Sequence, residues 1–237
     1  DWSSDVCSSD LVQDKVGADP TGLPFNSVIA LELHGGKPLS PLVNAGAIAT
    51  TSLINAENTE QRWQRILHIQ QQLAGEQVAL SDEVNQSEQT TNFHNRAIAW
   101  LLYSAGYLYC DAMEACDVYT RQCSTLINTI ELATLGATLA AGGVNPLTHK
   151  RVLQADNVPY ILAEMMMEGL YGRSGDWAYR VGLPGKSGVG GGILAVVPGV
   201  MGIAAFSPPL DEEGNSVRGQ KMVASVAKQL GYNVFKG

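Results

Sequence analysis

Apolar side chains recur at helical spacing through the first two thirds of the chain. Ile98, Leu101, Leu102 and Ala105 stand at positions i, i+3, i+4 and i+7, which is typical of one buried helix face. Capping residues and glycines bound each apolar run. The pattern predicts four helices: about 59–74, about 92–105, one from Asn128 to Gly142-Gly143, and one with Pro159 in its first turn that ends at Gly169.

After residue 170 the pattern changes to short runs separated by Gly/Pro turns. We predict strands at 179–183, 193–197 and 200–206, antiparallel because their connections are short. Asn215 and Ser216 open a last helix that ends at Gly231 and covers one side of the sheet. The predicted class is α+β, an antiparallel sheet flanked by helices with an inserted helical subdomain. Three strands are few for this length, so we expect N-terminal strands to be missing.

The first ten residues, DWSSDVCSSD, differ from the rest because they hold four serines and three aspartates without any period. They are similar to the translated read-through of a sequencing adapter, although an ordinary disordered N-terminus would look alike. We therefore expect residues 1–10 to be a non-native leader and residues 11–237 to form a single domain. Its helical part would span about 47–170, and the sheet with the C-terminal helix about 171–237.

Composition excludes several classes of protein. Of 237 residues, 45% are hydrophobic, which is enough for a sizeable core and excludes disorder. The net charge of −8, without a basic cluster, excludes nucleic acid as a partner. The uncharged stretch 188–210 holds six glycines and three prolines, so it favours two strands over a membrane span. Four cysteines without zinc spacing predict a reduced, cytoplasmic protein with no metal.

Residues 185–192, GKSGVGGG, form a glycine-rich segment but match neither the P-loop nor the dinucleotide-binding spacing. Two interpretations remain open. Lys186 and the glycines can end a strand where a substrate approaches main-chain N–H groups, as at an oxyanion site. Alternatively, the segment is a turn with an exposed lysine.

Several polar residues are candidates for binding a small zwitterion. Glu88 and Asn95 stand seven residues apart, which places them on one face if a single helix spans both. A buried acid beside an amide suits a ligand with an ammonium and a carboxylate group, whereas a solvated Glu and a capping Asn are the plainer alternative. Asn44 is either a turn residue or a second such amide. Tyr119 and Tyr171 are candidates for proton relay or, more simply, amphipathic core residues.

Taken together, the motifs of the chain resemble those of the serine-dependent glutaminases from about Val12 to the C-terminus. The segments that carry the resemblance are Asp19-Pro20-Thr21-Gly22, Phe25-Asn26-Ser27, Asn44-Ala45-Gly46-Ala47-Ile48, Asn95-Arg96, Lys186-Ser187-Gly188-Val189 and Phe206-Ser207-Pro208-Pro209-Leu210. The resemblance implies a fold of the β-lactamase and penicillin-binding-protein type. It also implies hydrolysis of L-glutamine to L-glutamate and ammonia through a serine acyl-enzyme, without metal or organic cofactor, by a dimer or tetramer.

The resemblance also assigns roles to individual residues. The α-amino and α-carboxylate groups of glutamine would be held by four residues: Asn44, Glu88, Asn95 and Tyr119. Tyr171 matches a tyrosine that contacts the substrate and transfers protons near the nucleophile. Val189 matches the residue whose main-chain N–H binds the developing oxyanion, and Lys186 belongs to the K-[ST]-G strand.

One part of the family pattern is not found. The nucleophile and its base lie in an S-x-x-K motif, and Ser3, Ser174 and Ser187 each lack a lysine three residues later. We therefore expect the nucleophilic serine and its lysine to be absent and the chain as given to be inactive. Two alternatives stay open: a non-catalytic amino-acid-binding relative of the same fold, and a relative that acts on peptides or β-lactams.

Overall fold

The computed structural model describes residues 9–236, which divide into two compact units. Among the described residues, unit 1 comprises 9–71 and 76–126, and unit 2 comprises 72–75 and 127–236. Most of the expected leader lies outside the described residues, and Ser9 and Asp10 begin the first helix.

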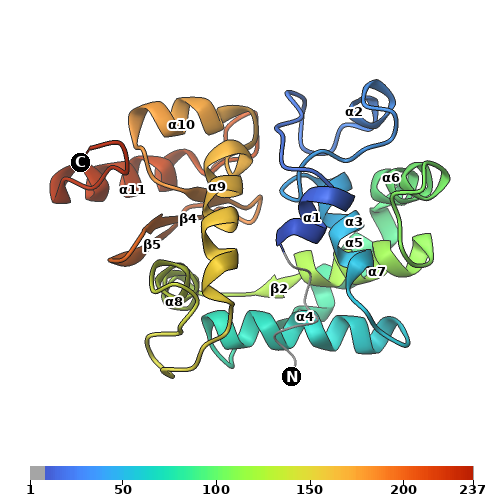
Figure 1. Cartoon of the computed structure of the whole chain (residues 1–237), viewed down its shortest axis with the longest axis horizontal. Helices are drawn as coiled ribbons and strands as arrows, with labels where there is room; N and C mark the ends of the chain where they lie inside the picture. Colours follow the sequence, from blue (N-terminus) through green and yellow to red (C-terminus); the bar gives the residue numbers. More distant parts are fainter. Residues whose placement is uncertain (1–8, 237) are drawn as a thin grey trace. The chain divides into compact units, whose positions relative to one another are not determined.

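Unit 1 is helical, and its helices are labelled in Figure 1. Its helices are α1 (Ser9–Lys15), α2 (Val28–Leu33), α3 (Asn44–Leu53), most of α4 (Thr59–Ala74), α5 (Asp82–Thr91), α6 (Phe93–Ser104) and α7 (Ala112–Cys123). A short antiparallel pair joins β1 (Ala79–Leu80) to β2 (Thr125–Leu126). The core lies where α3, α6 and α7 meet, around the fully buried Ile48, Ile98 and Leu102. Its apolar contacts fix the three helices on which several candidate residues stand.

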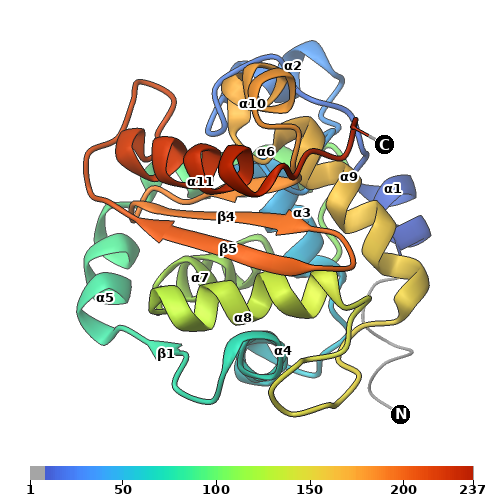
Figure 2. The ribbon, with the colours of Figure 1, turned by 90° about the vertical axis from the view of Figure 1, so that its left-hand side faces the viewer.

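Unit 2 contains a three-stranded antiparallel sheet between two helices. Its elements are α8 (Thr129–Ala140), η1 (Ala155–Asn157), α9 (Val158–Glu168), η2 (Tyr171–Arg173), α10 (Ser174–Arg180), β3 (Gly185–Ser187), β4 (Gly192–Val197), β5 (Met201–Phe206) and α11 (Val217–Leu230). The strand order is β3-β4-β5, with Lys186 opposite Leu194 and Ile193 opposite Ala205. Helix α11 lies along one side of the sheet and α8 along the other (Figure 2). This arrangement confirms the predicted α+β class and the predicted last helix.

Glycines let α8 lie close to the sheet. A Cβ atom on Gly136 would collide with the Leu194 side chain, and one on Gly202 would collide with the backbone of α8. The close approach buries β4 on both faces, so that its residues from Ile193 to Val197 are all buried.

The predicted helix boundaries are confirmed where a cap specifies them. The side chain of Asn128 accepts from two N–H groups at the start of α8, and Glu131 accepts from the Asn128 N–H in return, which is a complete capping box. Ser216 caps α11, and Gly231 ends it in the left-handed conformation at φ +76°.

The strand predicted at 179–183 is wrong. Residues up to Arg180 belong to α10, which buries Trp177 and pairs Asp176 with Arg180 one turn later. The Trp177 indole N–H donates to the Leu183 carbonyl oxygen at 2.8 Å. The chain after Arg180 therefore turns back toward the Trp177 ring and does not continue as a strand. The strand begins afterwards, at Gly185.

Helix length and cysteine state bear on the environment in which the protein works. Among residues 9–236, no helix is both long and apolar enough to cross a bilayer. Cys110, Cys116 and Cys123 are free thiols, and burial raises the pKa of the Cys110 and Cys116 thiols above the ordinary value for cysteine.

Candidate functional site

Three of the predicted residues of unit 1 form one hydrogen-bonded cluster. The Asn44 side-chain amide donates to Asn95 Oδ1 at 2.9 Å, and the Tyr119 hydroxyl donates to Asn44 Oδ1 at 3.0 Å. The three residues come from α3, α6 and α7, whose apolar faces form the core of the unit. The cluster therefore lies on a packed frame, which fixes the direction of its remaining amide donors.

Small residues place Asn44 at the start of α3. Val43 is the N-cap, and the Asn44 N–H donates to the Phe25 carbonyl oxygen at 2.9 Å. Gly46 passes so close to the Ser40 carbonyl that any Cβ atom there would collide with it. Of the two interpretations of Asn44, the structure favours an amide held by a tight small-residue segment over a simple turn residue.

Glu88 and Asn95 do not share one helix face, contrary to the prediction. The helix breaks at the buried Asn92, whose side-chain amide donates to Thr120 Oγ1 at 2.9 Å. Glu88 therefore stands on α5 and Asn95 on α6. Glu88 is also exposed, whereas the sequence interpretation expected a buried acid. The pattern of polar and apolar residues does not reveal this helix break, because the break occurs at a single residue, Asn92, whose side chain is buried against α7.

The helix that carries Glu88 is nevertheless fixed on both sides. Gln89 donates through Nε2 to Asp117 Oδ1 on α7 at 2.6 Å, and the Arg96 guanidinium on α6 donates to the Gln89 carbonyl oxygen at 2.6 Å. Within residues 9–236, the Glu88 carboxylate forms no hydrogen bond or ion pair, and neither does the Asn95 Nδ2 group. Unit 1 thus presents an unpaired carboxylate and an unpaired amide donor on fixed helices.

Unit 2 brings together Tyr171 and Lys186. Lys186 Nζ donates to the Tyr171 hydroxyl at 3.2 Å, lies 4.3 Å from the centre of its ring, and also contacts the Ser187 carbonyl oxygen. Both side chains are half-buried. Tyr171 has φ +54°, a left-handed conformation that is costly for a tyrosine. Strained backbone of this kind is enriched at functional sites, and the ammonium group over the ring forms a cation–π contact.

Val189 lies in the turn that joins β3 to β4. The Gly188 N–H donates to the Gly192 carbonyl oxygen, and the Gly191 N–H donates to that of Gly188, which closes the turn. The Val189 N–H has no acceptor among the described residues, and its side chain is exposed. This main-chain N–H is therefore available to an external oxygen, which supports the oxyanion interpretation of the segment over a plain turn.

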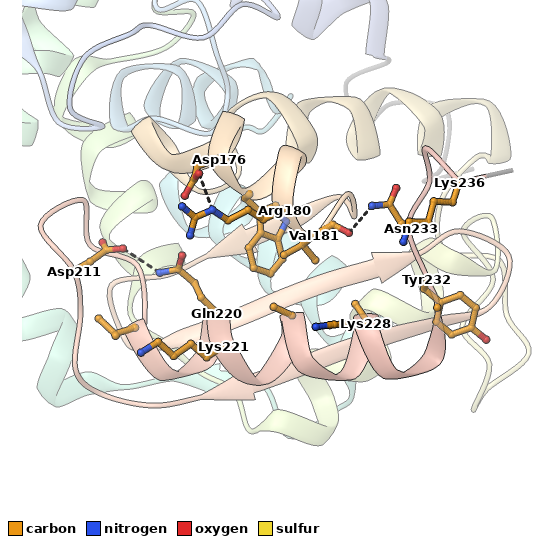
Figure 3. A pocket seen from close by; sticks show the side chains of 15 residues that line it. Asp176, Arg180, Val181, Asp211, Gln220, Lys221, Lys228, Tyr232, Asn233 and Lys236 are labelled. Atoms are coloured by element: carbon orange, nitrogen blue, oxygen red, sulfur yellow. Dashed lines mark hydrogen bonds and ion pairs between the residues drawn. The ribbon is translucent and has the colours of Figure 1, made fainter.

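A cleft of about 410 Å³ in unit 2 lies between α10, α11 and the C-terminal segment (Figure 3). Arg180, Lys221, Lys228 and Lys236 line it, and Arg180 pairs with Asp176. None of the seven predicted site residues lines this cleft, so we assign it no part in glutamine chemistry.

The expectation that no S-x-x-K occurs in the chain is wrong. Ser225-Val226-Ala227-Lys228 has this spacing in α11, and the sequence interpretation overlooked it. Both side chains are exposed. Ser225 interacts with Gln229 Nε2 at 3.0 Å, while Lys228 lines the cleft of Figure 3. The two are not a buried nucleophile and base, so the match is one of spacing only.

Comparison with known proteins identifies relatives over most of the chain. The sequence profile of a family described as Glutaminase matches residues 4–235. Glutaminase 1 of Escherichia coli strain K12 is 98% identical over 226 residues, which are 95% of this chain and 73% of that protein. Glutaminase 1 of Shigella flexneri is 99% identical with the same coverage.

Solved structures similar to this chain are also glutaminases. A probable glutaminase structure has a TM-score of 0.95 at 97% identity, covering 96% of this chain and 74% of that one. A Bacillus subtilis glutaminase, solved as its covalent complex with 5-oxo-L-norleucine formed from 6-diazo-5-oxo-L-norleucine, has a TM-score of 0.84 at 30% identity. That match covers 95% of this chain and 74% of that one.

The fold and these matches define an α+β amide hydrolase with a β-lactamase-like fold. The chain belongs to the glutaminase family, whose reaction converts L-glutamine to L-glutamate and ammonia. This confirms the predicted family and activity. It does not favour a non-catalytic binding relative.

Proposed function

We propose that unit 1 recognises free L-glutamine through Asn44, Glu88, Asn95 and Tyr119. The observation that carries this proposal is the hydrogen-bonded cluster of two amides and a phenol on three packed helices. Its unpaired amide donors suit the α-carboxylate of an amino acid. The unpaired carboxylate of Glu88 suits the α-ammonium group, since charge-assisted hydrogen bonds are the strong ones.

In unit 2 we assign the chemical roles to Tyr171, Lys186 and Val189. In the reaction, a serine oxygen attacks the side-chain carbonyl carbon and the serine proton passes to the amide nitrogen, so that the C–N bond breaks and ammonia leaves. Water then cleaves the acyl-enzyme ester and releases L-glutamate. The Val189 N–H is suited to bind the oxyanion of each tetrahedral intermediate, which is worth ~3 kcal/mol in comparable sites. Tyr171, bonded to Lys186, is suited to carry protons. Ser225 is not assigned as the nucleophile.

Calorimetric titration with L-glutamine and N-acetyl-L-glutamine tests the recognition proposal. Acetylation removes the ammonium charge that Glu88 would bind, so we expect L-glutamine to bind and the acetylated compound to bind at least about tenfold more weakly. Equal affinity for both compounds would contradict the assignment of Glu88. It would favour a relative that acts on acylated amines, such as peptides.

We further propose that the protein associates with a second copy of itself through one face of α6 and α2. Five apolar residues of these two helices, which are in contact, are between 51% and 68% exposed: Ile29, Leu33, Phe93, Trp100 and Tyr103. Fully burying an aromatic side chain covers about 150–250 Å². The three aromatic residues therefore leave ~100 Å² each, or ~600 Å² over two copies. The smaller Ile29 and Leu33 add to this area, and a specific interface needs about 1,000 Å² in total.

A second copy suits this face better than a charged partner does. Phe93, Ala97 and Trp100 stand at i, i+4 and i+7, so the same stripe on two copies can pack against itself about a two-fold axis. Helix α6 carries no acidic residue, although the chain has a net charge of −8. Two copies can therefore approach along α6 without bringing carboxylates together, whereas α2 carries one exposed acid, Glu32.

Sedimentation velocity tests the association. We expect the unsubstituted protein to form dimers or larger assemblies and Trp100→Glu to shift it to the monomer, because the charge would be buried at the centre of the contact. Tyr179→Glu is the matched control, since Tyr179 is an exposed aromatic residue on α10 of the other unit. A monomeric unsubstituted protein, or an assembly that Trp100→Glu leaves intact, would contradict the proposal.

We place the protein in the cytoplasm. The support is chemical: the three described cysteines are free thiols, and thiols stay reduced in that compartment.

A further inference from the structure

The side chain of Asn215 is 0% exposed and is bonded at both of its ends. Its Oδ1 accepts a hydrogen bond from Ser187 Oγ at 2.5 Å, and its Nδ2 donates to the Leu170 carbonyl oxygen at 3.2 Å. Leu170 and Ser187 are themselves buried. The amide therefore bridges two segments that are seventeen positions apart in the sequence.

Each of these segments carries one member of the Tyr171–Lys186 pair. Leu170 directly precedes Tyr171, and Ser187 directly follows Lys186 in β3. The Ser187 N–H also donates to the Gly169 carbonyl oxygen at 3.0 Å. The relative position of the phenol and the ammonium group thus depends on how the backbone before Tyr171 is held against β3.

The left-handed conformation of Tyr171 needs such support. A tyrosine in this region is strained and persists only where its neighbours fix it. Ser174 Oγ accepts from the Leu170 N–H at 3.0 Å and donates to the Tyr171 carbonyl oxygen at 2.9 Å. The Leu170 carbonyl oxygen in turn accepts from Asn215 Nδ2 and from the Arg173 main-chain N–H.

Asn215 is in turn anchored to the C-terminal helix. Asp211 Oδ1 accepts from the Asn215 main-chain N–H at 2.9 Å and lies 3.4 Å from Asn215 Nδ2. Gln220 on α11 donates to Asp211 Oδ2 at 3.0 Å, an interaction drawn in Figure 3. The support of Asn215 therefore extends from α11 to the start of η2.

We propose that Asn215 is a positioning residue that sets the geometry of the Tyr171–Lys186 pair, an inference that rests on the catalytic roles proposed for that pair. Asparagine is required because one end of its side chain must accept and the other must donate. Aspartate could accept from Ser187 but would place an acceptor against the Leu170 carbonyl. Alanine would remove both bonds and leave the Leu170 carbonyl with only the Arg173 N–H and Ser187 Oγ with only the Gly169 carbonyl oxygen, at 3.4 Å.

The position of Lys186 can be measured without any activity. Because its Nζ lies 4.3 Å from the Tyr171 ring centre, the ring shifts the Lys186 ε-methylene NMR signal upfield from those of the other six lysines. Lys186→Met identifies the signal. In Asn215→Ala we expect the upfield shift to be lost. In Asn215→Asp we expect it to be reduced, because the contacts of Nδ2 with Leu170 and Asp211 are lost while the bond from Ser187 is kept.

Asn145→Ala is the matched control. Asn145 is an equally buried amide of unit 2, and it donates to the Gln72 carbonyl oxygen at 2.8 Å, so its loss destabilises the unit in a similar way. In Asn145→Ala we expect the chemical shift of the Lys186 ε-methylene signal to be unchanged. An unchanged Lys186 signal in Asn215→Ala would overturn the proposal. Should Asn215→Ala fail to fold, an unchanged signal in Asn215→Asp would do so.

Turnover separates this proposal from the proposed function. The same substitutions are made in the E. coli relative of 98% identity. We expect Asn215→Asp to lower kcat by about tenfold or more with KM unchanged, since misplacement slows the chemical step and leaves recognition intact. An unchanged kcat beside a displaced Lys186 signal would contradict the positioning role. Full activity of Tyr171→Phe would instead remove the proposed function of Tyr171, while the NMR result would stand.

Discussion

Replacing Glu88 by glutamine is expected to weaken the binding of L-glutamine about 10- to 100-fold. The carboxylate has no other partner among the described residues, so its charge is available to the ligand's ammonium group. A hydrogen bond to a charged group is worth about 1.5–3 kcal/mol. Glutamine at this position keeps the size of the side chain and an acceptor oxygen but loses the charge. Calorimetric titration with L-glutamine measures the change in affinity.

The control for this substitution is Glu83→Gln. Glu83 lies on the same helix, α5, and is also exposed, so the variant changes the net charge of the protein by the same amount. We expect it to bind L-glutamine like the unsubstituted protein. Equal losses in the two variants would show a general effect of charge and would contradict a specific contact with Glu88.

The largest effect on stability is expected for Gly169→Ala, with a loss of about 3 kcal/mol in the free energy of unfolding. Gly169 ends α9 and touches β3 so closely that a Cβ atom would overlap the Gly185 carbonyl oxygen. Both sides of this contact are backbone, so no side chain can move aside. Denaturation by urea, followed by circular dichroism, measures the loss.

Gly175→Ala is the matched control for Gly169→Ala. Gly175 lies in α10 of the same unit, and a Cβ atom there would meet no atom within 4 Å. Because alanine favours the helix over glycine by up to about 1 kcal/mol, this variant should unfold at an equal or higher urea concentration. A Gly169→Ala protein as stable as Gly175→Ala would show that α9 and β3 are not in close contact.

Local signals in the sequence predict much of the fold. The capping box at Asn128 and Glu131, and the glycine at 231, fix helix ends through contacts within a few residues. The strand predicted at 179–183 fails for the opposite reason. There the conformation is decided by Trp177, whose ring is buried and whose indole N–H donates to the Leu183 carbonyl oxygen. The apolar and polar pattern of residues 177–183 does not reveal this contact.

The candidate site shows the same limit. The resemblance supplies all seven predicted residues, but the sequence does not reveal that Asn92 separates Glu88 from Asn95. Nor does it indicate the left-handed conformation of Tyr171 or the bridge formed by Asn215, which the pattern identifies only as a helix opener. These features depend on side chains that meet from distant segments. Conversely, Ser225 and Lys228 fit a spacing motif that their exposure does not support.

The central claim is that named residues of this chain recognise L-glutamine, and amide NMR on the ¹⁵N-labelled protein tests it most directly. On addition of L-glutamine, we predict shifts of the Asn44 and Asn95 side-chain amide signals and of the Val189 main-chain amide, with little change at Asn145. Unchanged Asn44 and Asn95 signals at saturating L-glutamine, or shifts of equal size at Asn145, would contradict it.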